Sequence, residues 1–254
     1  MVRRIIGGWL MIDMEGDYVK TGIPGIDSLL GEQGIPRGYV VFVNGAPGSG
    51  KTTFAIQFLY KGATQFDEPG VYVSLDESPT HITRNMKSFG WDLEKLEDEN
   101  KLVMLDSSPI RRIKREIKVK REFSMERLID TVGEVISKIG AKRVAIDPLA
   151  ILTIQYPSTL DRVYAVMDLL QALAETQCTT LMISELKTSA MEREYQLEEY
   201  LAQGTILLRT FEKPGGLIRA FQIEKLRGIK HDPQPRPYTI TGEGIEVYPE
   251  ERVL

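Results

Sequence analysis

The residues best suited to chemistry lie in segment 45–52, GAPGSGKT. They satisfy the pattern G-x-x-x-x-G-K-[ST] at Gly45, Gly50, Lys51 and Thr52. The glycines let the backbone curl so that successive N–H groups point at phosphate oxygens, and the N-terminus of a following helix adds partial positive charge. Lys51 would reach the β- and γ-phosphates, and the Thr52 hydroxyl would ligate Mg²⁺. The pattern therefore predicts a site for ATP with Mg²⁺.

The elements around this loop are those that the motif requires. Residues 39–44 form an apolar β-branched and aromatic run that predicts a buried strand, and residues 53–60 place apolar side chains on one helical face. Strand, loop and helix are thus expected in that order. The residues expected to line the phosphates are Gly45, Ala46, Pro47, Gly48, Ser49, Gly50, Lys51, Thr52 and Thr53.

Acidic residues follow two other predicted strands. Asp147 comes directly after the apolar run 144–146, where a phosphate-loop enzyme holds the Mg²⁺ shell, so Thr52 and Asp147 are the expected metal residues. Asp76 and Glu77 close the run 71–75, and a carboxylate there can orient and deprotonate water. The alternatives are an aspartate in a turn before a proline and a solvated acidic turn before a helix.

Composition indicates one large α/β domain. The chain has 254 residues, of which 42% are hydrophobic and 27% charged, and a formal charge of −4. That charge argues against a surface that binds nucleic acid throughout. The single cysteine, Cys178, excludes an internal disulfide and predicts a buried thiol in a reducing, cytoplasmic setting. We expect no membrane span, and an N-terminal extension at 1–20 that forms a packing strand or a tail across a neighbouring subunit.

Strands and helices alternate along most of the chain, which predicts a mostly parallel sheet flanked by helices. The further strands expected are 71–75, 102–105, 143–146 and 180–183, and the helices are 79–89 after Ser78, 125–139 after Ser124, and 160–175. After residue 204, short strands separated by Gly- and Pro-rich turns predict an antiparallel C-terminal edge at 205–209, 217–226, 238–240 and 245–248.

From about Thr21 to Pro249 the chain resembles a single-domain member of the KaiC-like branch of the RecA superfamily. The matching stretches are TGIPGIDSLL with GIPRG, GAPGSGKT, the acidic pair before Ser-Pro, SFGWD, AID, KLRGIKH, YTIT and GIEVYP. The resemblance implies a RecA-like P-loop NTPase domain at 21–254. It also implies a ring-forming ATPase, hexameric, with nucleotide between subunits.

The resemblance also implies roles for single residues. Glu77, with Asp76 beside it, matches the catalytic acidic pair, and Lys51 completes the catalytic set. Nucleotide contacts are implied for Ser88, Lys225, Leu226, Arg227, His231 and Thr241. The chain departs from the family where Ser184-Glu185 is followed by Leu186 instead of an arginine. It also has no second copy of the domain, so clock function is not carried over.

Lys225 and Arg227 lie two apart, so their side chains should share one face of a strand while Leu226 points the other way. The resemblance implies that both reach the γ-phosphate bound by the adjacent subunit. The alternative is a pair of solvated charges on an edge strand.

Segment 111–122 holds seven basic and two acidic residues. A nucleic-acid contact there would make the chain a DNA-recombination protein whose DNA binding is regulated by ATP. Interleaved Ile113, Ile117 and Val119 make an exposed hairpin or a contact with another subunit or protein partner at least as economical. Segment 187–199 is rich in glutamate, which is poor for phosphate binding. A monomeric small-molecule kinase is the third reading, for which no acceptor pocket is evident.

Overall fold

The computed structural model describes residues 4–6, 9–11, 18–106, 125–156, 158–186, 196–213 and 216–253. Its centre is a nine-stranded sheet in the order β13-β12-β11-β10-β5-β9-β8-β6-β7. The six strands from β10 to β7 are parallel, and β11, β12 and β13 continue the sheet antiparallel. The strands are β5 Val40–Gly45, β6 Gly70–Ser74, β7 Leu102–Asp106, β8 Arg143–Asp147, β9 Thr179–Glu185, β10 Gly204–Lys213, β11 Gly216–Leu226, β12 Arg236–Thr241 and β13 Gly244–Val247.

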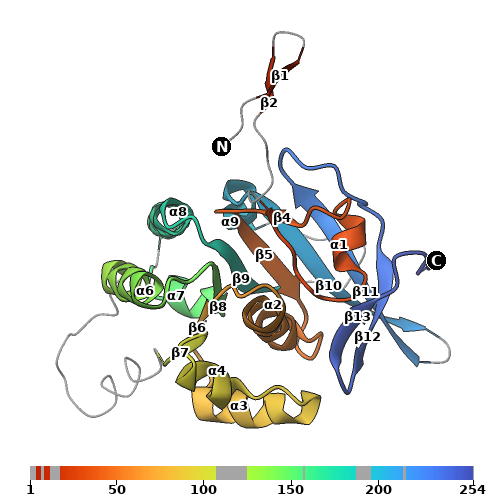
Figure 1. The fold of residues 1–254 in the computed structure, drawn as a ribbon, viewed down its shortest axis with the longest axis horizontal. Helices are drawn as coiled ribbons and strands as arrows, with labels where there is room; N and C mark the ends of the chain where they lie inside the picture. The colour runs from red at the N-terminus through yellow and green to blue at the C-terminus, as the bar shows by residue number, and fades with distance from the viewer. Residues whose placement is uncertain are drawn as a thin grey trace.

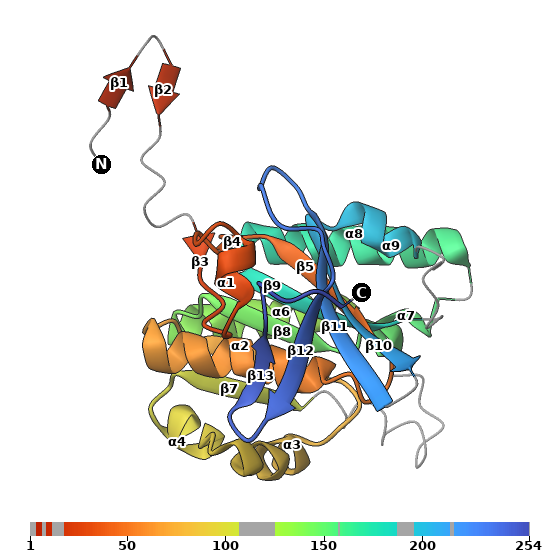
Figure 2. The same cartoon turned by 90° about the vertical axis from the view of Figure 1, so that its right-hand side faces the viewer.

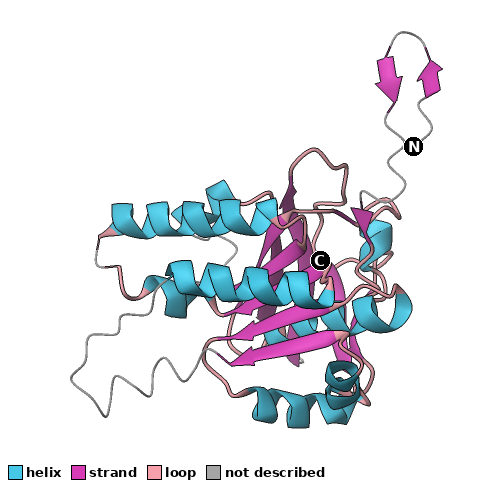
Figure 3. Ribbon diagram, turned by 60° about the vertical axis from the view of Figure 1, so that its left-hand side comes forward, coloured by secondary structure: helices cyan, strands magenta, loops and turns pink. Residues whose placement is uncertain are grey.

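Helices cover both faces of this sheet (Figures 1 and 3). Side chains alternate along β5, so Val41 and Val43 face one core cluster while Val40 and Phe42 face the other. The first cluster takes α1 Ile26–Leu29, α2 Lys51–Gln65, α3 Pro79–Met86 and α4 Leu93–Asp98, and the second takes α6 Met125–Ile139, α7 Leu149–Thr153 and α8 Thr159–Glu175. A short helix, α9 Leu197–Leu201, lies beside α8 (Figures 1 and 2).

The expected fold class is confirmed, and five of the six parallel strands lie within two residues of their predicted bounds. Strand β10 differs from its prediction: it runs to Lys213 instead of residue 209, and it pairs parallel with β5, so the antiparallel edge begins at β11. The parallel direction arises because the segment with α9, between β9 and β10, returns the chain to the start of β5. The predicted helix 79–89 divides into α3 and a 3-10 turn, Lys87–Phe89, and Ser78 caps it by accepting the His81 N–H at 3.4 Å. Residue 124, the other expected cap, lies outside the described residues, as do segments 111–122 and 187–195. Cys178 is buried as expected.

Sequence reasoning missed the shortest helices, α1, α4, α7 and α9. Each has four to six residues, which is too short to show a helical period. Helix α1 lies within segment 21–31, TGIPGIDSLLG, whose glycines and proline predict a loop. There Asp27 accepts hydrogen bonds from the Thr21 N–H and hydroxyl and from the Gly22 N–H, at 2.8 to 3.1 Å.

Two small sheets precede β5. Strand β1 Arg4–Ile6 pairs antiparallel with β2 Trp9–Met11, and β3 Tyr18–Val19 pairs with β4 Ile35–Pro36. The side chain of Val19 is fully buried, so the core begins within the first twenty residues. Among the described residues, no helix is long and apolar enough to cross a membrane.

Candidate functional site

The phosphate loop joins the carboxyl end of β5 to the N-terminus of α2. Gly48 and Gly50 adopt positive φ angles of 78° and 88°, which L side chains rarely adopt. A Cβ on Gly45 would lie 2.8 Å from the Leu208 carbonyl oxygen, and one on Gly50 would lie 2.8 Å from Ile240 Cδ1. The pattern therefore selects glycine both for backbone conformation and for close packing against β10 and β12.

Lys51 folds back over this loop. Its Nζ donates to the carbonyl oxygens of Gly45 at 2.8 Å and Ala46 at 3.1 Å. Burial lowers the pKa of Lys51, and the negative charge of nearby carboxylates opposes that shift. A phosphate beside this half-buried ammonium would supply a compensating anion, so the residues present fit a phosphate ligand.

Thr52 and Asp147 meet as the sequence predicts. Thr52 Oγ1 donates to Asp147 Oδ2 at 2.7 Å, and the Tyr72 hydroxyl donates to the same oxygen at 2.8 Å. Burial raises the pKa of Asp147, while these two hydrogen bonds lower it. The described residues contain no group of three His, Cys, Asp or Glu that could hold a metal alone. Mg²⁺ commonly takes one or two protein oxygens together with phosphates and water, so the pair fits that ion.

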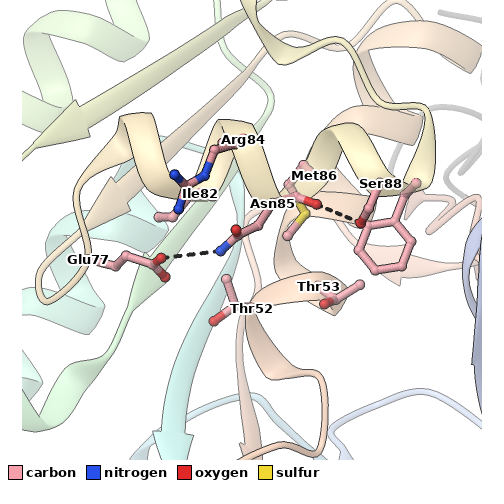
Figure 4. A pocket seen from close by; sticks show the side chains of 9 residues that line it. Thr52, Thr53, Glu77, Ile82, Arg84, Asn85, Met86 and Ser88 are labelled. Carbon is pink, nitrogen blue, oxygen red and sulfur yellow. Dashed lines mark hydrogen bonds between the residues drawn. The ribbon is translucent and has the colours of Figure 1, made fainter.

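Glu77 lies beside a cavity of about 540 Å³ that Thr52, Thr53 and Ser88 also line. Figure 4 shows its carboxylate facing Asn85, whose Nδ2 donates to Glu77 Oε1 at 3.4 Å. The Ser74 hydroxyl donates to the Glu77 carbonyl oxygen. Glu77 is therefore held by hydrogen bonds to both its side chain and its main chain, beside the cavity that Thr52 also lines.

The other expected contacts on this side are spread around the loop. Asp76 is exposed at the end of β6 and adds negative charge near Lys51. Ser88 donates its hydroxyl to the Asn85 carbonyl at 2.7 Å. Strand β12 runs in the direction of β5, so Thr241 at its end lies toward the same edge of the sheet. Pro47 and Gly48 are exposed at the tip of the loop.

Three hydrogen-bonding residues at this edge were not predicted from the sequence. Tyr72 lies inside β6 and reads in the sequence as an ordinary core aromatic, and Asn85 is a polar residue on the exposed face of a helix. Tyr238 is a third: its buried hydroxyl donates to the Ser49 carbonyl at 2.6 Å. Such contacts depend on which strands become neighbours, and local sequence carries no signal for that.

Lys225 and Arg227, the residues predicted to act on the neighbouring subunit's ATP, lie at the amino ends of the parallel strands, opposite the phosphate loop. We call these two ends of the parallel strands the amino edge and the carboxyl edge of the sheet. Leu226 pairs with Gly204, which pairs with Val41, so the end of β11 is level with the start of β5. At roughly 3.3 Å per residue, the four residues to Gly45 span roughly 13 Å. Lys225 and Arg227 therefore lie at the end of the sheet opposite the phosphate loop of their own subunit.

Both cations turn toward one side, as expected. Lys225 Nζ donates to the Glu199 carbonyl at 2.9 Å, and Arg227 donates to the Tyr200 carbonyl at 2.8 Å. Burial lowers the pKa of Lys225, and the charge of Arg227 lowers it further. The Leu226 side chain points into the core, so a nucleotide could meet its backbone alone.

His231 lies on the loop that follows, with Nδ1 2.9 Å from the Ile229 carbonyl oxygen. Because this loop begins where β11 ends, His231 lies at the same end of the sheet as Arg227, as the motif spacing predicts.

Comparison with known families agrees with this geometry. A family model described as "ATPase: KaiC" matches residues 19–252. The chain belongs to the KaiC ATPase family. It is therefore an ATP-binding ATPase domain of the RecA superfamily, and the predicted family is confirmed.

Relatives within the KaiC family fall into two lengths. The chain is 39% identical to the UPF0273 protein MJ1359 of Methanocaldococcus jannaschii, covering 92% of this chain and 97% of that protein. It is 37% identical to the circadian clock oscillator protein KaiC of Synechococcus elongatus, covering 91% of this chain and 44% of that protein. The chain thus spans less than half of the clock protein.

A crystal structure with this fold is also known. The KaiC-like protein PH0186 from Pyrococcus horikoshii superposes with a TM-score of 0.79 at 36% identity, covering 91% of this chain and 99% of that one. The sheet with its antiparallel edge is therefore the family fold.

Proposed function

We propose that the chain hydrolyses ATP in a Mg²⁺-dependent reaction, as a hexameric ring with nucleotide between subunits. The observation that carries the proposal is the convergence of Lys51, the Thr52–Asp147 pair and Glu77 on one edge of the sheet. They come from three different segments of the chain, and a phosphate-loop ATPase needs these groups together.

The roles follow from the contacts. Lys51 and the loop amides bind the β- and γ-phosphates, and Thr52 and Asp147 hold the metal. When bound, Mg²⁺ supplies positive charge that offsets the charge on the phosphates. Glu77 accepts a proton from water as the water oxygen bonds to the γ-phosphorus and the bond to the β-phosphate oxygen breaks. The products are ADP and phosphate.

Phosphate release measures this activity directly. Lys51→Ala and Glu77→Gln should each abolish most turnover, because one removes a phosphate ligand and the other the base. Lys61→Ala, at the second lysine of α2, is the matched control and should retain turnover. Turnover that survives both active-site changes would refute the proposal.

The proposal of a ring is supported by the separation between the phosphate loop and the two cations, Lys225 and Arg227. Because Lys225 and Arg227 lie at the far edge of the sheet, a phosphate that they contact must be held by another subunit. ATP would then bridge two subunits and stabilise the ring by mass action. Sedimentation velocity should show larger particles with MgATP than without it, and Lys51→Ala should remove the difference. A chain that stays monomeric at saturating ATP would contradict the ring.

A further inference from the structure

Helix α9 connects the two edges of the sheet. At its start, Gln196 Nε2 donates to the Glu185 carbonyl at 3.1 Å. Glu185 is paired with Gly45, and the Leu186 N–H donates to the Gly45 carbonyl at 3.3 Å. Gln196 is thus bonded to the strand end that borders the phosphate loop.

Gln196 also begins the helix. Its side chain accepts the Glu199 N–H, and the Gln196 N–H donates to Glu199 Oε1 at 3.3 Å, which forms a capping box. Glu199 is buried, so this end of α9 is fixed against the protein body. One side chain therefore sets both where α9 begins and how it is attached to β9.

The other end of α9 holds the two cations. Carbonyls in the last turn of a helix lack partners within the helix and accept from outside. Here those of Glu199 and Tyr200 accept from Lys225 Nζ and the Arg227 guanidinium, at 2.9 and 2.8 Å. The Arg227 N–H also donates to the Gln203 carbonyl at 2.9 Å, just beyond the helix. A shift of α9 would therefore move both cations.

We propose that Gln196 is a positioning residue, which places Lys225 and Arg227 for the neighbouring subunit's ATP by fixing α9 to the end of β9. The inference rests on the proposed trans action of these cations. It adds a structural link from the edge that binds nucleotide to the edge that serves the next subunit. Small displacements at a reacting group can cost up to about a hundredfold in rate, so a loosened α9 should lower turnover.

A single substitution can remove the hydrogen bond between Gln196 and Glu185, which we call the tie, while keeping residue 196 as the N-cap of α9. Gln196→Ser keeps a good N-cap acceptor, with Glu199 three residues on, and so preserves the helix. The shorter side chain cannot reach the Glu185 carbonyl. Gln177→Ser is the matched control, because the Gln177 amide also donates to a main-chain carbonyl at 3.1 Å, that of Ala174.

Mixed rings locate the effect. Subunits with Lys51→Ala offer intact cations and a defective loop, and subunits with Arg227→Ala offer the reverse. Turnover in the mixture therefore comes from interfaces that combine the two. Gln196→Ser in the Lys51→Ala subunits should lower kcat about tenfold with little change in KM. In the Arg227→Ala subunits it should have no effect, and neither should the control in either subunit.

Two outcomes overturn the inference, and they differ in meaning. The mixture could be active and lose the same turnover whichever subunit carries Gln196→Ser, or lose none in either case. That result would refute the positioning role of Gln196 but not the trans action. A mixture that is inactive without Gln196→Ser, although subunits exchange, refutes the trans action and the inference with it.

Hydrogen exchange tests the tie without assembled rings. In single subunits Gln196→Ser should speed exchange at the Arg227 amide, which is bonded beside α9, and Gln177→Ser should not. Unchanged exchange would refute the inference.

Discussion

The carboxyl and amino edges of the sheet hold their charged groups in different ways. At the carboxyl edge, Lys51 is bonded to the Gly45 carbonyl of its own loop at 2.8 Å, and the Thr52 hydroxyl is bonded to Asp147 at 2.7 Å. At the amino edge, Lys225 and Arg227 are bonded to main-chain carbonyls, and among the described residues neither forms an ion pair. The first edge brings together the groups expected to bind phosphate and Mg²⁺ within one subunit, whereas the second presents positive charge that fits an anion from another molecule.

A third cation shows that the amino edge can also bury charge permanently. Arg143 begins β8, has no exposed side-chain surface, and donates to Glu68 Oε2 at 2.8 and 2.6 Å. It also donates to the carbonyls of Phe58 and Lys20, each at 2.8 Å. A cation with a structural role here is enclosed and paired with a carboxylate. Arg227, which is exposed, is held differently.

The largest effect should come from Arg227→Ala. Removing an arginine finger costs on the order of a thousandfold in turnover, whereas the phosphate loop of the same subunit is unaltered. Titration with a fluorescent ATP analogue should give nearly unchanged affinity, while kcat falls. Lys230→Ala, three residues on and exposed, is the control. If Arg227→Ala lowered ATP affinity as much as turnover, the amino edge would take part in binding ATP like the carboxyl edge, and the proposed difference between them would be wrong.

Next in size is the loss of the buried pair through Glu68→Gln. An uncompensated Arg143 should lower the free energy of unfolding by about 3 kcal/mol, which urea denaturation measures. ATP turnover per folded subunit should stay unchanged, because the pair is far from the phosphate loop. Glu94→Gln, which breaks the exposed contact with Lys87, should cost much less. Similar losses of unfolding free energy for Glu68→Gln and Glu94→Gln would mean that burial of the Arg143–Glu68 pair adds nothing to stability.

Local sequence predicted the carboxyl edge well because its signals are local. The phosphate-loop pattern defines four residues within the eight positions 45–52, and an aspartate at the end of another parallel strand must lie at the same edge of the sheet. The parallel strands are mostly apolar runs, so their existence and approximate bounds could be predicted as well.

The connections between the edges could not be predicted. Helix α9 has five residues, and its role depends on Gln196 meeting Glu185, eleven positions away across residues with no periodic pattern. The Arg143–Glu68 pair joins residues 75 apart, and Tyr238 reaches Ser49 across 189 positions. Such contacts follow from strand order, which the motifs alone do not specify.

A smaller effect on turnover is expected from Asn85, and not from other exposed residues of α3. Asn85→Ala removes the donor to Glu77 Oε1, so the carboxylate should lose orientation and kcat should fall about tenfold, the order of one hydrogen bond to a charged group. KM should change little, since the side-chain hydrogen bonds that involve Asn85 go to Glu77 and Ser88 and not to the phosphate loop. Thr80→Ala, exposed on the same helix, should leave kcat unchanged. An effect on KM alone would assign Asn85 to substrate binding instead.

The smallest effect concerns the strand hairpin that supports the carboxyl edge. The Tyr238 hydroxyl is buried, and burial raises its pKa, so it stays a neutral donor to the Ser49 carbonyl at 2.6 Å. Tyr238→Phe keeps the ring in the core but leaves that carbonyl without this donor. The expected loss is on the order of 1 kcal/mol in unfolding free energy, with a modest weakening of ATP binding because Ser49 belongs to the phosphate loop. Tyr248→Phe makes the same change on the same hairpin, where the hydroxyl contacts Thr239 and Glu246, outside the loop. Denaturation and nucleotide titration should therefore distinguish the two variants. If Tyr248→Phe weakened ATP binding as much, the hairpin as a whole, and not its contact with Ser49, would support the loop.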